Sequence, residues 1–477
     1  MVVKSYTIND SREYIADNEV RGSNLSMSTN GDAEAQRNKG KAGNAAGGDD
    51  DYDPYANRSV KHPTSYGDTL FHIMKASLGT GILALPSAFR NAGYVTGVVG
   101  TLVIGFFCTY CIHLLVRAQH ELCRRRKIPS LTYPQIAEVA IGEGPPSLRW
   151  LAPYGRKVTL VFLILCELGA NCIYVIFVAS NLKAVFDHYY GDHDVRLYVL
   201  AIFLPLLLLC WVRNLKFLAP FSAFASGVTI ISFGITLYYV FTDIPSLKDR
   251  TEVSGLHELP LFFGTVMFSM SAIGIIMPLE NEMKKPKNFT SKFGVLNVSM
   301  LSIAIIYAAF GFFGYLKYGE EVMGSITLNL PPTEMLAQSV RIMQSVAIFC
   351  TFAIPHYIVF DIMWNRGIKL KLEKNKCTLL WEYVFRSAIV IITFLSAVLV
   401  PNLELFISFN GALCLPFMSI GFPAIVDLLT FWDHRQGAGK VILVLKNAVV
   451  FLIALVGFVT GVNASVRAMI HEYYKTG

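Results

Sequence analysis

Two apolar stretches of this sequence are interrupted by small and polar residues whose types suit the binding of a charged ligand. In the first stretch these residues are Ser77, Gly79, Thr80 and Gly81. In the second they are Ser269, Ser271 and Gly274. Glycine is a poor helix-interior residue, so we expect both helices to break and to leave unpaired backbone groups. Free amides suit a carboxylate and free carbonyls suit an ammonium group, so the two breaks together favour a zwitterionic amino acid. Close helix packing through small residues is the alternative.

Two ionisable residues within apolar stretches are candidates for moving a proton, because burying such a group is costly without a partner or a function. His72 precedes Gly79 by seven residues, about two helical turns, and its imidazole titrates near neutral pH. Contact with headgroups or solvent at a helix end is the alternative for His72. Glu167 has no basic residue nearby in sequence, so we expect it to be protonated, paired across helices or facing water. For Glu280, an ion pair with the nearby Lys284 and Lys285 is a sufficient explanation of its position, so we expect local pairing there.

The elements that position these residues are expected to be membrane helices. Of the 477 residues, 53% are hydrophobic and only 16% are charged, whereas soluble proteins carry about 25% charged residues. The mean hydropathy is +0.47. This composition disfavours a soluble enzyme, a disordered scaffold and a disulfide-built secreted module. No Walker loop, metalloprotease motif or nucleophile elbow is present, so we predict neither an enzyme nor a bound cofactor or metal.

Eleven stretches are apolar over about the 20 residues that a helix needs to cross a bilayer. They are 69–89, 93–116, 158–184, 196–212, 216–241, 260–280, 294–316, 335–363, 379–400, 403–428 and 441–466. The sequence therefore predicts an all-α membrane protein with a disordered tail (1–65), a transporter domain (66–470) and a short C-terminal tail (471–477). The two interrupted stretches are the first and the sixth. That spacing is typical of an inverted repeat of five plus five helices, here with one extra helix.

Basic residues are distributed unequally between the loops. The loops that follow even-numbered stretches contain 21 Lys and Arg residues, whereas the opposite loops and the C-terminal tail contain 8. Because basic residues of short loops stay in the cytosol, we predict a cytosolic N-terminus and a C-terminus on the other side. The formal net charge of +7 is thereby attributed to membrane orientation, and we predict no nucleic-acid partner.

Three motifs carry a resemblance to a known family. They are Leu-Gly-Thr-Gly-Ile-Leu-Ala-Leu-Pro-Ser-Ala-Phe (78–89), Met-Pro-Leu-Glu-Asn-Glu-Met-Lys-Lys-Pro (277–286) and Gly-Ser-Ile-Thr-Leu-Asn-Leu-Pro (324–331). Together they resemble the proton-assisted amino acid transporters, solute carrier family 36, of the amino acid/auxin permease superfamily, in an animal, insect-like form. The resemblance implies eleven helices with a LeuT-like repeat, and small neutral amino acids carried with protons or by facilitated flux. It also implies a plasma membrane or late endosomal or lysosomal location, and nutrient-signalling partners that link transport to growth control.

The resemblance assigns roles to particular residues. The family's proton-coupling histidine corresponds to His72, and its substrate-contacting break corresponds to Gly79, Thr80 and Gly81. One departure concerns Ser271, which stands where the family commonly has glutamate. We therefore expect a secondary amino acid transporter that works by alternating access. The alternative is an amino acid sensor with little transport; an ion channel is less favoured, because no selectivity filter is evident.

Overall fold

The structure is a computed structural model that describes residues 52–58, 60, 63–213, 215–270, 273–369 and 377–476. The predicted disordered tail, residues 1–65, lies largely outside the described residues. Within the described ranges the chain is helical and contains no strand; a single isolated bridge joins Thr64 to Met283. The prediction of an all-α protein is thereby confirmed.

The first predicted stretch forms three short helices, α2 (Tyr66–Ser77), α3 (Thr80–Leu83) and α4 (Leu85–Ala92). The sixth forms α10 (Leu259–Ser269) and α11 (Ile273–Glu282). The other long helices are α5 (Tyr94–Arg126), α7 (Ala152–Tyr190), α8 (Val195–Cys210), α9 (Leu215–Phe241), α12 (Val295–Tyr318), α14 (Met335–Thr351), α15 (Ala353–Phe360), α17 (Thr378–Leu399), α18 (Leu403–Leu415), α19 (Phe422–Thr430) and α20 (Ala438–Thr476).

Short elements connect or continue these helices. They are α6 (Tyr133–Glu143), α13 (Ile326–Asn329), the 3₁₀ turns η2 (Pro146–Leu151), η3 (Leu247–Asp249), η4 (Pro286–Asn288) and η5 (Gly319–Glu321), and the π-helical segments η6 (Asp361–Ile368) and η7 (Pro416–Gly421). Both π-helical segments extend a preceding α-helix, so α14–α15–η6 and α18–η7–α19 each form one longer run. Such π-helical turns are rare and are often found near functional sites.

Nine helical runs in the described part of the chain are long and apolar enough to cross a membrane. They correspond to nine of the predicted stretches. The fourth stretch corresponds to α8, whose 16 residues make it a shorter apolar helix, and the first is divided among α2, α3 and α4. The chain is therefore a multi-pass membrane protein.

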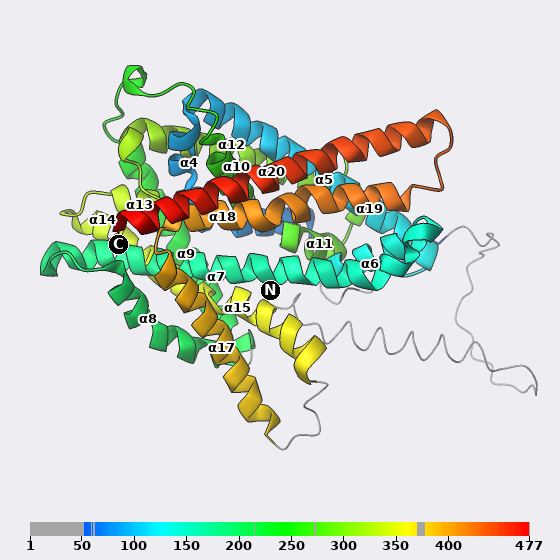
Figure 1. The fold of residues 1–477 in the computed structure, drawn as a ribbon, viewed down its shortest axis with the longest axis horizontal. Helices are drawn as coiled ribbons and strands as arrows, with labels where there is room; N and C mark the ends of the chain where they lie inside the picture. The colour runs from blue at the N-terminus through cyan, green and yellow to red at the C-terminus, as the bar shows by residue number, and fades with distance from the viewer. Residues whose placement is uncertain are drawn as a thin grey trace, which may run out of the picture.

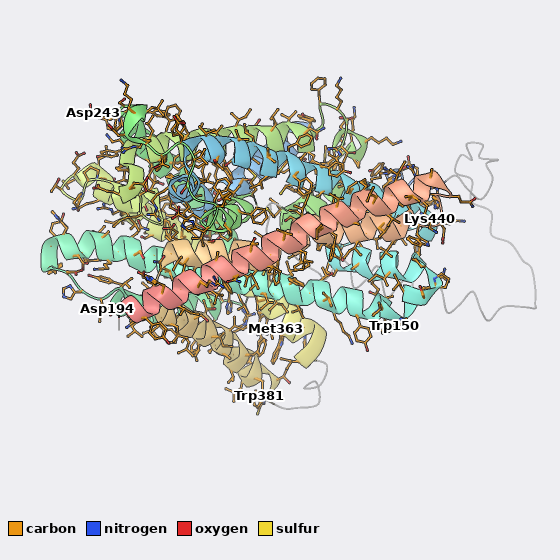
Figure 2. The ribbon with its side chains drawn as sticks, turned by 45° about the horizontal axis from the view of Figure 1, so that its top comes forward. Trp150, Asp194, Asp243, Met363, Trp381 and Lys440 are labelled. Carbon is orange, nitrogen blue, oxygen red and sulfur yellow. The ribbon has the colours of Figure 1, made fainter. Side chains whose placement is uncertain are left out.

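The residues beside the two breaks lie within the bundle, since Thr80 is 3% and Ser269 7% exposed, whereas much of α2 is exposed. Helices α10 and α18 pack together, as do α12 and α5, and α4 contacts both α10 and α12. Helices α7 and α20 run along the length of the molecule, while α8, α15 and α17 gather on one side of α7 (Figure 1). Figure 2 places Trp150 and Lys440 at one end of the molecule and Asp194 at the other.

Candidate functional site

The first break separates α2 from α3. Helix α2 ends at Ser77, and its last turn closes when the backbone N–H of Leu78 bonds the carbonyl of Lys75. Gly79 then adopts an extended conformation, with φ −138° and ψ −154°, before helical geometry resumes at Thr80. The break therefore falls within the predicted Gly-Thr-Gly segment. Pro86 lies in the first turn of α4, where its missing N–H is not needed.

The second break separates α10 from α11. Helix α10 ends at Ser269, and the backbone N–H of Met270 bonds the carbonyl of Val266. Helical geometry resumes at Ile273, so Gly274 belongs to the first turn of α11. Ser271, the predicted site residue at which this chain departs from the family pattern, lies outside the described residues.

The two breaks touch each other at Gly81 and Ser269. The Ser269 hydroxyl lies 2.8 Å from the carbonyl oxygen of Gly81 and 2.8 Å from that of Thr265 in its own helix. A Cβ atom on Gly81 would lie 2.7 Å from the Cα atom of Ser269, closer than real Cβ atoms approach. Only glycine fits at position 81 in this packing. The structure thus brings together site residues that are 188 positions apart in the sequence.

A buried tyrosine that the sequence analysis missed connects the same two breaks. Tyr307 of α12 is 1% exposed, and its hydroxyl reaches the carbonyl oxygens of both Ser77 and Ser269, the latter at 3.1 Å. These carbonyls belong to the last residues of α2 and α10. Because helix C-termini carry partial negative charge, a hydrogen-bond donor or a cation is the group that suits this position.

Open space adjoins the far side of each break. Among the described residues, a Cβ atom on Gly79 or on Gly274 would meet no atom within 4 Å, in contrast to Gly81. Thr80, which follows Gly79, is 3% exposed. Helix termini that face open space are able to contact a zwitterion, with carbonyls toward its amine and amides toward its carboxylate.

His72 lies on α2, the helix that ends at the first break. The side chain is half-buried, its ring packs edge-on against Phe71, and its buried Nδ1 atom has no hydrogen-bond partner among the described residues. An unpaired buried nitrogen normally calls for a partner such as a water molecule or a transferable proton. This environment is compatible with the predicted role.

Glu167 lies on α7. Its side chain is half-buried, and no hydrogen bond or ion pair joins it to another described residue. One turn further along α7, Asn171 is fully buried with both polar side-chain atoms unpaired. The neighbouring backbone carbonyl of Cys166 accepts a bond from Asn410 of α18 at 3.2 Å. Asn171, one helical turn from Glu167, is thus a second polar side chain in this part of α7 that has no hydrogen-bond partner among the described residues.

Arg341 is a further buried charge within an apolar stretch that the sequence analysis missed. Its side chain, on α14, donates to the carbonyls of Thr327, Leu328 and Leu330, while Nη1 has no partner in the part of the chain that the structure describes. It thereby fixes the third family motif, residues 324–331, against α14. The sequence signal that could have identified Arg341 is a charged residue inside an apolar stretch.

No group of His, Cys, Asp and Glu in the described ranges could hold a metal ion.

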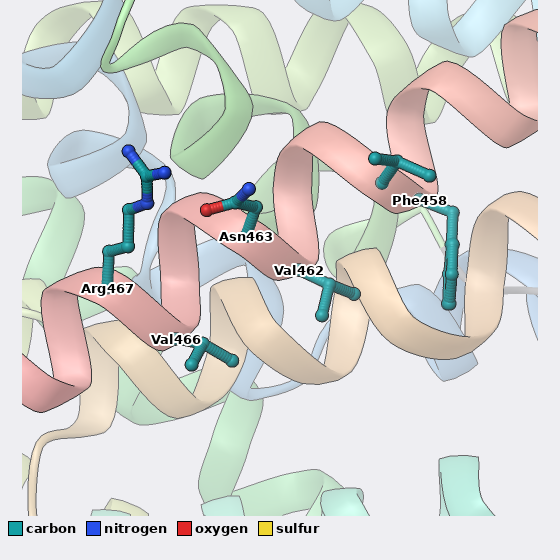
Figure 3. Close-up of a pocket in the computed structure, with 6 residues that line it drawn as sticks. Phe458, Val462, Asn463, Val466 and Arg467 are labelled. Carbon is teal, nitrogen blue, oxygen red and sulfur yellow. The ribbon is translucent and has the colours of Figure 1, made fainter.

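A surface groove lies apart from these breaks. Figure 3 shows it along α20, lined by Phe458, Val459, Val462, Asn463, Val466 and Arg467. All six residues belong to one helix, and the groove is open and almost entirely apolar. A chain that crosses a membrane exposes such apolar surface to lipid, so we assign no ligand site there.

A bundle of membrane helices with two broken helices meeting inside it is the architecture of a membrane transporter. The sequence profile of the family described as transmembrane amino acid transporter protein matches residues 62–467. The chain belongs to this family. It is accordingly an amino acid transporter-family protein embedded in a membrane, and not an enzyme.

Individual relatives agree with this assignment. The chain is similar to the Drosophila melanogaster proton-coupled amino acid transporter-like protein pathetic, with 38% identity over 425 residues that cover 89% of each chain. It is also similar to the Arabidopsis thaliana amino acid transporter AVT3A, with 28% identity over 410 residues, 84% of this chain and 90% of the plant protein. The resemblance to an insect-like proton-assisted transporter is thereby confirmed.

Among solved structures, the chain is similar in fold to the inward-facing conformation of Mhp1. The TM-score is 0.53 at 15% identity, and the match covers 88% of this chain and 92% of that chain. At this identity the likeness concerns the fold alone.

Proposed function

We propose that this protein is a secondary transporter that moves small neutral amino acids across a membrane by alternating access. One observation carries the proposal: the C-terminal carbonyls of α2 and α10 converge on the hydroxyl of Tyr307, beside the open space at Gly79 and Gly274. The converging carbonyls suit the α-ammonium group of an amino acid, and the amides that begin α3 suit its α-carboxylate.

The proposed binding site consists of the residues at the two breaks: Ser77, Gly79, Thr80, Gly81, Ser269, Ser271 and Gly274. Among these, Ser269 and Gly81 contact each other and hold the two breaks together, so their proposed role is structural support of the site. Gly79 and Gly274 adjoin the open side and leave room for the ligand. Small residues at both positions favour close approach of the backbone to a small substrate.

The proposed topology has eleven spans, with an inverted repeat of five plus five and one extra helix. Counting the divided run α2–α4 and the short α8 as spans, together with the nine longer runs, supports this number. The placement of the breaks in the first and sixth spans supports the repeat. The proposed transporter domain is 66–470, followed by a short extracytosolic segment, 471–477.

Coupling to protons is the proposed driving mechanism, with His72 as the first candidate residue and Glu167 as the second. The unpaired Nδ1 of His72, on the helix that forms half of the site, supports the first assignment. The absence of any polar partner for Glu167 among the described residues supports the second, because an unpaired carboxyl in a membrane is favoured in its protonated form. Facilitated flux without protons is the alternative.

The proposed location is the plasma membrane or a late endosomal or lysosomal membrane, with the N-terminus in the cytosol. The excess of basic residues in one set of loops supports the orientation. Nutrient-signalling proteins are proposed as cytosolic partners, in line with the growth control expected from the resemblance.

Uptake of labelled alanine, proline and glycine by the purified protein in liposomes tests the function. We expect saturable uptake that an inward proton gradient increases. Binding of these amino acids without uptake would favour the sensor alternative, and large currents without a saturable substrate would favour a channel.

A further inference from the structure

The segment that precedes α2 crosses the end of α11 and is fastened there by a buried ion pair. Arg58 forms a two-pronged contact with Glu280, with Nη1 3.0 Å from Oε1 and Nη2 3.1 Å from Oε2. The side chains of Arg58 and Glu280 are only 6% and 1% exposed. The Arg58 guanidinium also donates to the backbone carbonyls of Glu280 and Pro129. The expected local pairing of Glu280 with the lysines that follow it is wrong.

Two further contacts hold the same segment in place. Thr64 pairs with the chain just after α11, because its N–H bonds the carbonyl of Glu282 at 2.9 Å and its carbonyl accepts from the N–H of Lys284 at 3.0 Å. At the other end of the segment, Asp53 accepts a bond from Lys287 at 3.1 Å. Burial acts to raise the pKa of Asp53, but the bonds from Lys287 and the Tyr55 amide lower it below its usual value, so Asp53 is charged.

Aromatic contacts join the same segment to α5. The Arg58 guanidinium lies over the ring of Tyr55, 4.8 Å from its centroid, and the Tyr55 ring lies 4.5 Å from that of His120. We call the described residues 52–58, 60 and 63–65 the strap. The strap leads directly into α2, so it ties half of the first broken span to half of the sixth and to α5.

From these contacts we propose that the strap is a gate, which closes the cytosolic end of the substrate path and opens when Arg58 and Glu280 separate. This inference rests on the proposed function and orientation. Opening a path to that end requires α2 and α11 to move apart, and the strap contacts hold them together. A buried ion pair suits a reversible contact, because each charge regains hydration when the pair opens to water, whereas an apolar contact loses its burial.

A disulfide across the strap tests whether it must move during transport. Thr64→Cys and Met283→Cys place thiols at the bridged pair, and the full-length double variant is reconstituted in liposomes. We expect oxidation to reduce alanine uptake by about tenfold or more, and dithiothreitol to restore it, because a closed gate blocks alternation. The two single-cysteine variants, oxidised in the same way, control for reaction at the native cysteines. Unchanged uptake in the oxidised, cross-linked double variant would overturn the gate.

Hydrogen exchange tests, independently of transport, whether the Arg58–Glu280 ion pair holds the strap in place. The double variant Arg58→Gln with Glu280→Gln removes both charges and leaves neither one buried alone. We expect faster exchange, by about tenfold, at the amides of Thr64 and Lys284, which bond across the strap, and no change in α20. Equal exchange rates in the variant and the parent would show that the ion pair does not hold the strap. If neither the parent nor any cysteine variant takes up an amino acid before oxidation, the proposed function fails. The exchange result then still shows whether the ion pair holds the strap.

Discussion

The Tyr307 hydroxyl lies 3.1 Å from the carbonyl oxygen of Ser269, the residue at which α10 ends. The same hydroxyl reaches the carbonyl of Ser77, where α2 ends. A phenol has one proton to donate, so it is able to satisfy only one of the two carbonyls at a time. The other acceptor is left available, and an ammonium group with three donors is a better match for the pair. Tyr307 therefore joins the two helix ends, and in the proposed site this arrangement presents both carbonyls to a substrate amine.

Replacing Tyr307 with Phe is expected to weaken substrate binding. The change removes the one donor that the two carbonyls share, at a cost of about 1–3 kcal/mol, and removes the contact that joins the two breaks. We expect the KM for alanine uptake to rise about tenfold with a smaller change in maximal rate. Tyr315→Phe is the matched control, because it removes a buried hydroxyl of the same helix that contacts Glu320 and the Thr251 amide instead. A KM equal in both variants would remove Tyr307 from the site.

The two glycines of the first break are expected to respond differently to alanine. Gly81→Ala forces a Cβ to within 2.7 Å of the Ser269 Cα, so we expect a loss of stability of about 1–3 kcal/mol and a lower unfolding temperature in detergent. Gly79→Ala meets open space, and its φ of −138° is accessible to alanine. We expect it to fold normally and to lower uptake by narrowing the ligand space. Normal uptake by Gly79→Ala would place the ligand elsewhere.

Proton coupling is expected to depend on His72. A glutamine at position 72 keeps a polar side chain but cannot take up a proton at neutral pH. We expect parent uptake to increase as the external pH falls, and His72→Gln uptake to be independent of pH. Glu167→Gln, measured over the same pH range, separates the second candidate from the first. A parent-like pH response in both variants would exclude both residues from coupling.

Glu382 is expected to matter for stability because two arginines share it. Arg386 is 2% exposed and contacts Glu382 at 3.3 Å, and Arg213 contacts the same carboxylate at 3.0 Å. Glu382→Gln leaves the buried Arg386 charge unpaired, which costs about 3–5 kcal/mol. Glu138→Gln, which breaks the exposed pair with Arg156, is expected to cost about 1 kcal/mol or less. Thermal unfolding of the two variants in detergent compares these effects, and equal unfolding temperatures would contradict the argument.

The sequence predicted the helical fold and the two breaks because their signals are local. Glycine and serine at the centre of an apolar stretch mark an interrupted helix, and the structure ends α2 and α10 at Ser77 and Ser269. Tyr307 gave no such signal, because an aromatic residue among apolar neighbours is equally suited to ordinary packing. Its role depends on two carbonyls that other helices bring to it.

The strap was also beyond sequence reasoning. Arg58 lies in a polar segment with no apolar periodicity, and its partner Glu280 is 222 residues away. Local charge pattern favoured pairing of Glu280 with Lys284 and Lys285, whereas tertiary packing buries Glu280 against the strap. Long-range pairs of this kind are set by the topology of the bundle, which the local sequence does not encode.

Uptake by the purified chain in liposomes tests the central claim most directly. Labelled alanine is offered with an inward proton gradient, without a gradient, and after the gradient has been collapsed by a proton ionophore. The account predicts saturable alanine uptake that unlabelled alanine competes away and that the gradient increases. A correctly folded, reconstituted protein that takes up no amino acid under any of these conditions would contradict it.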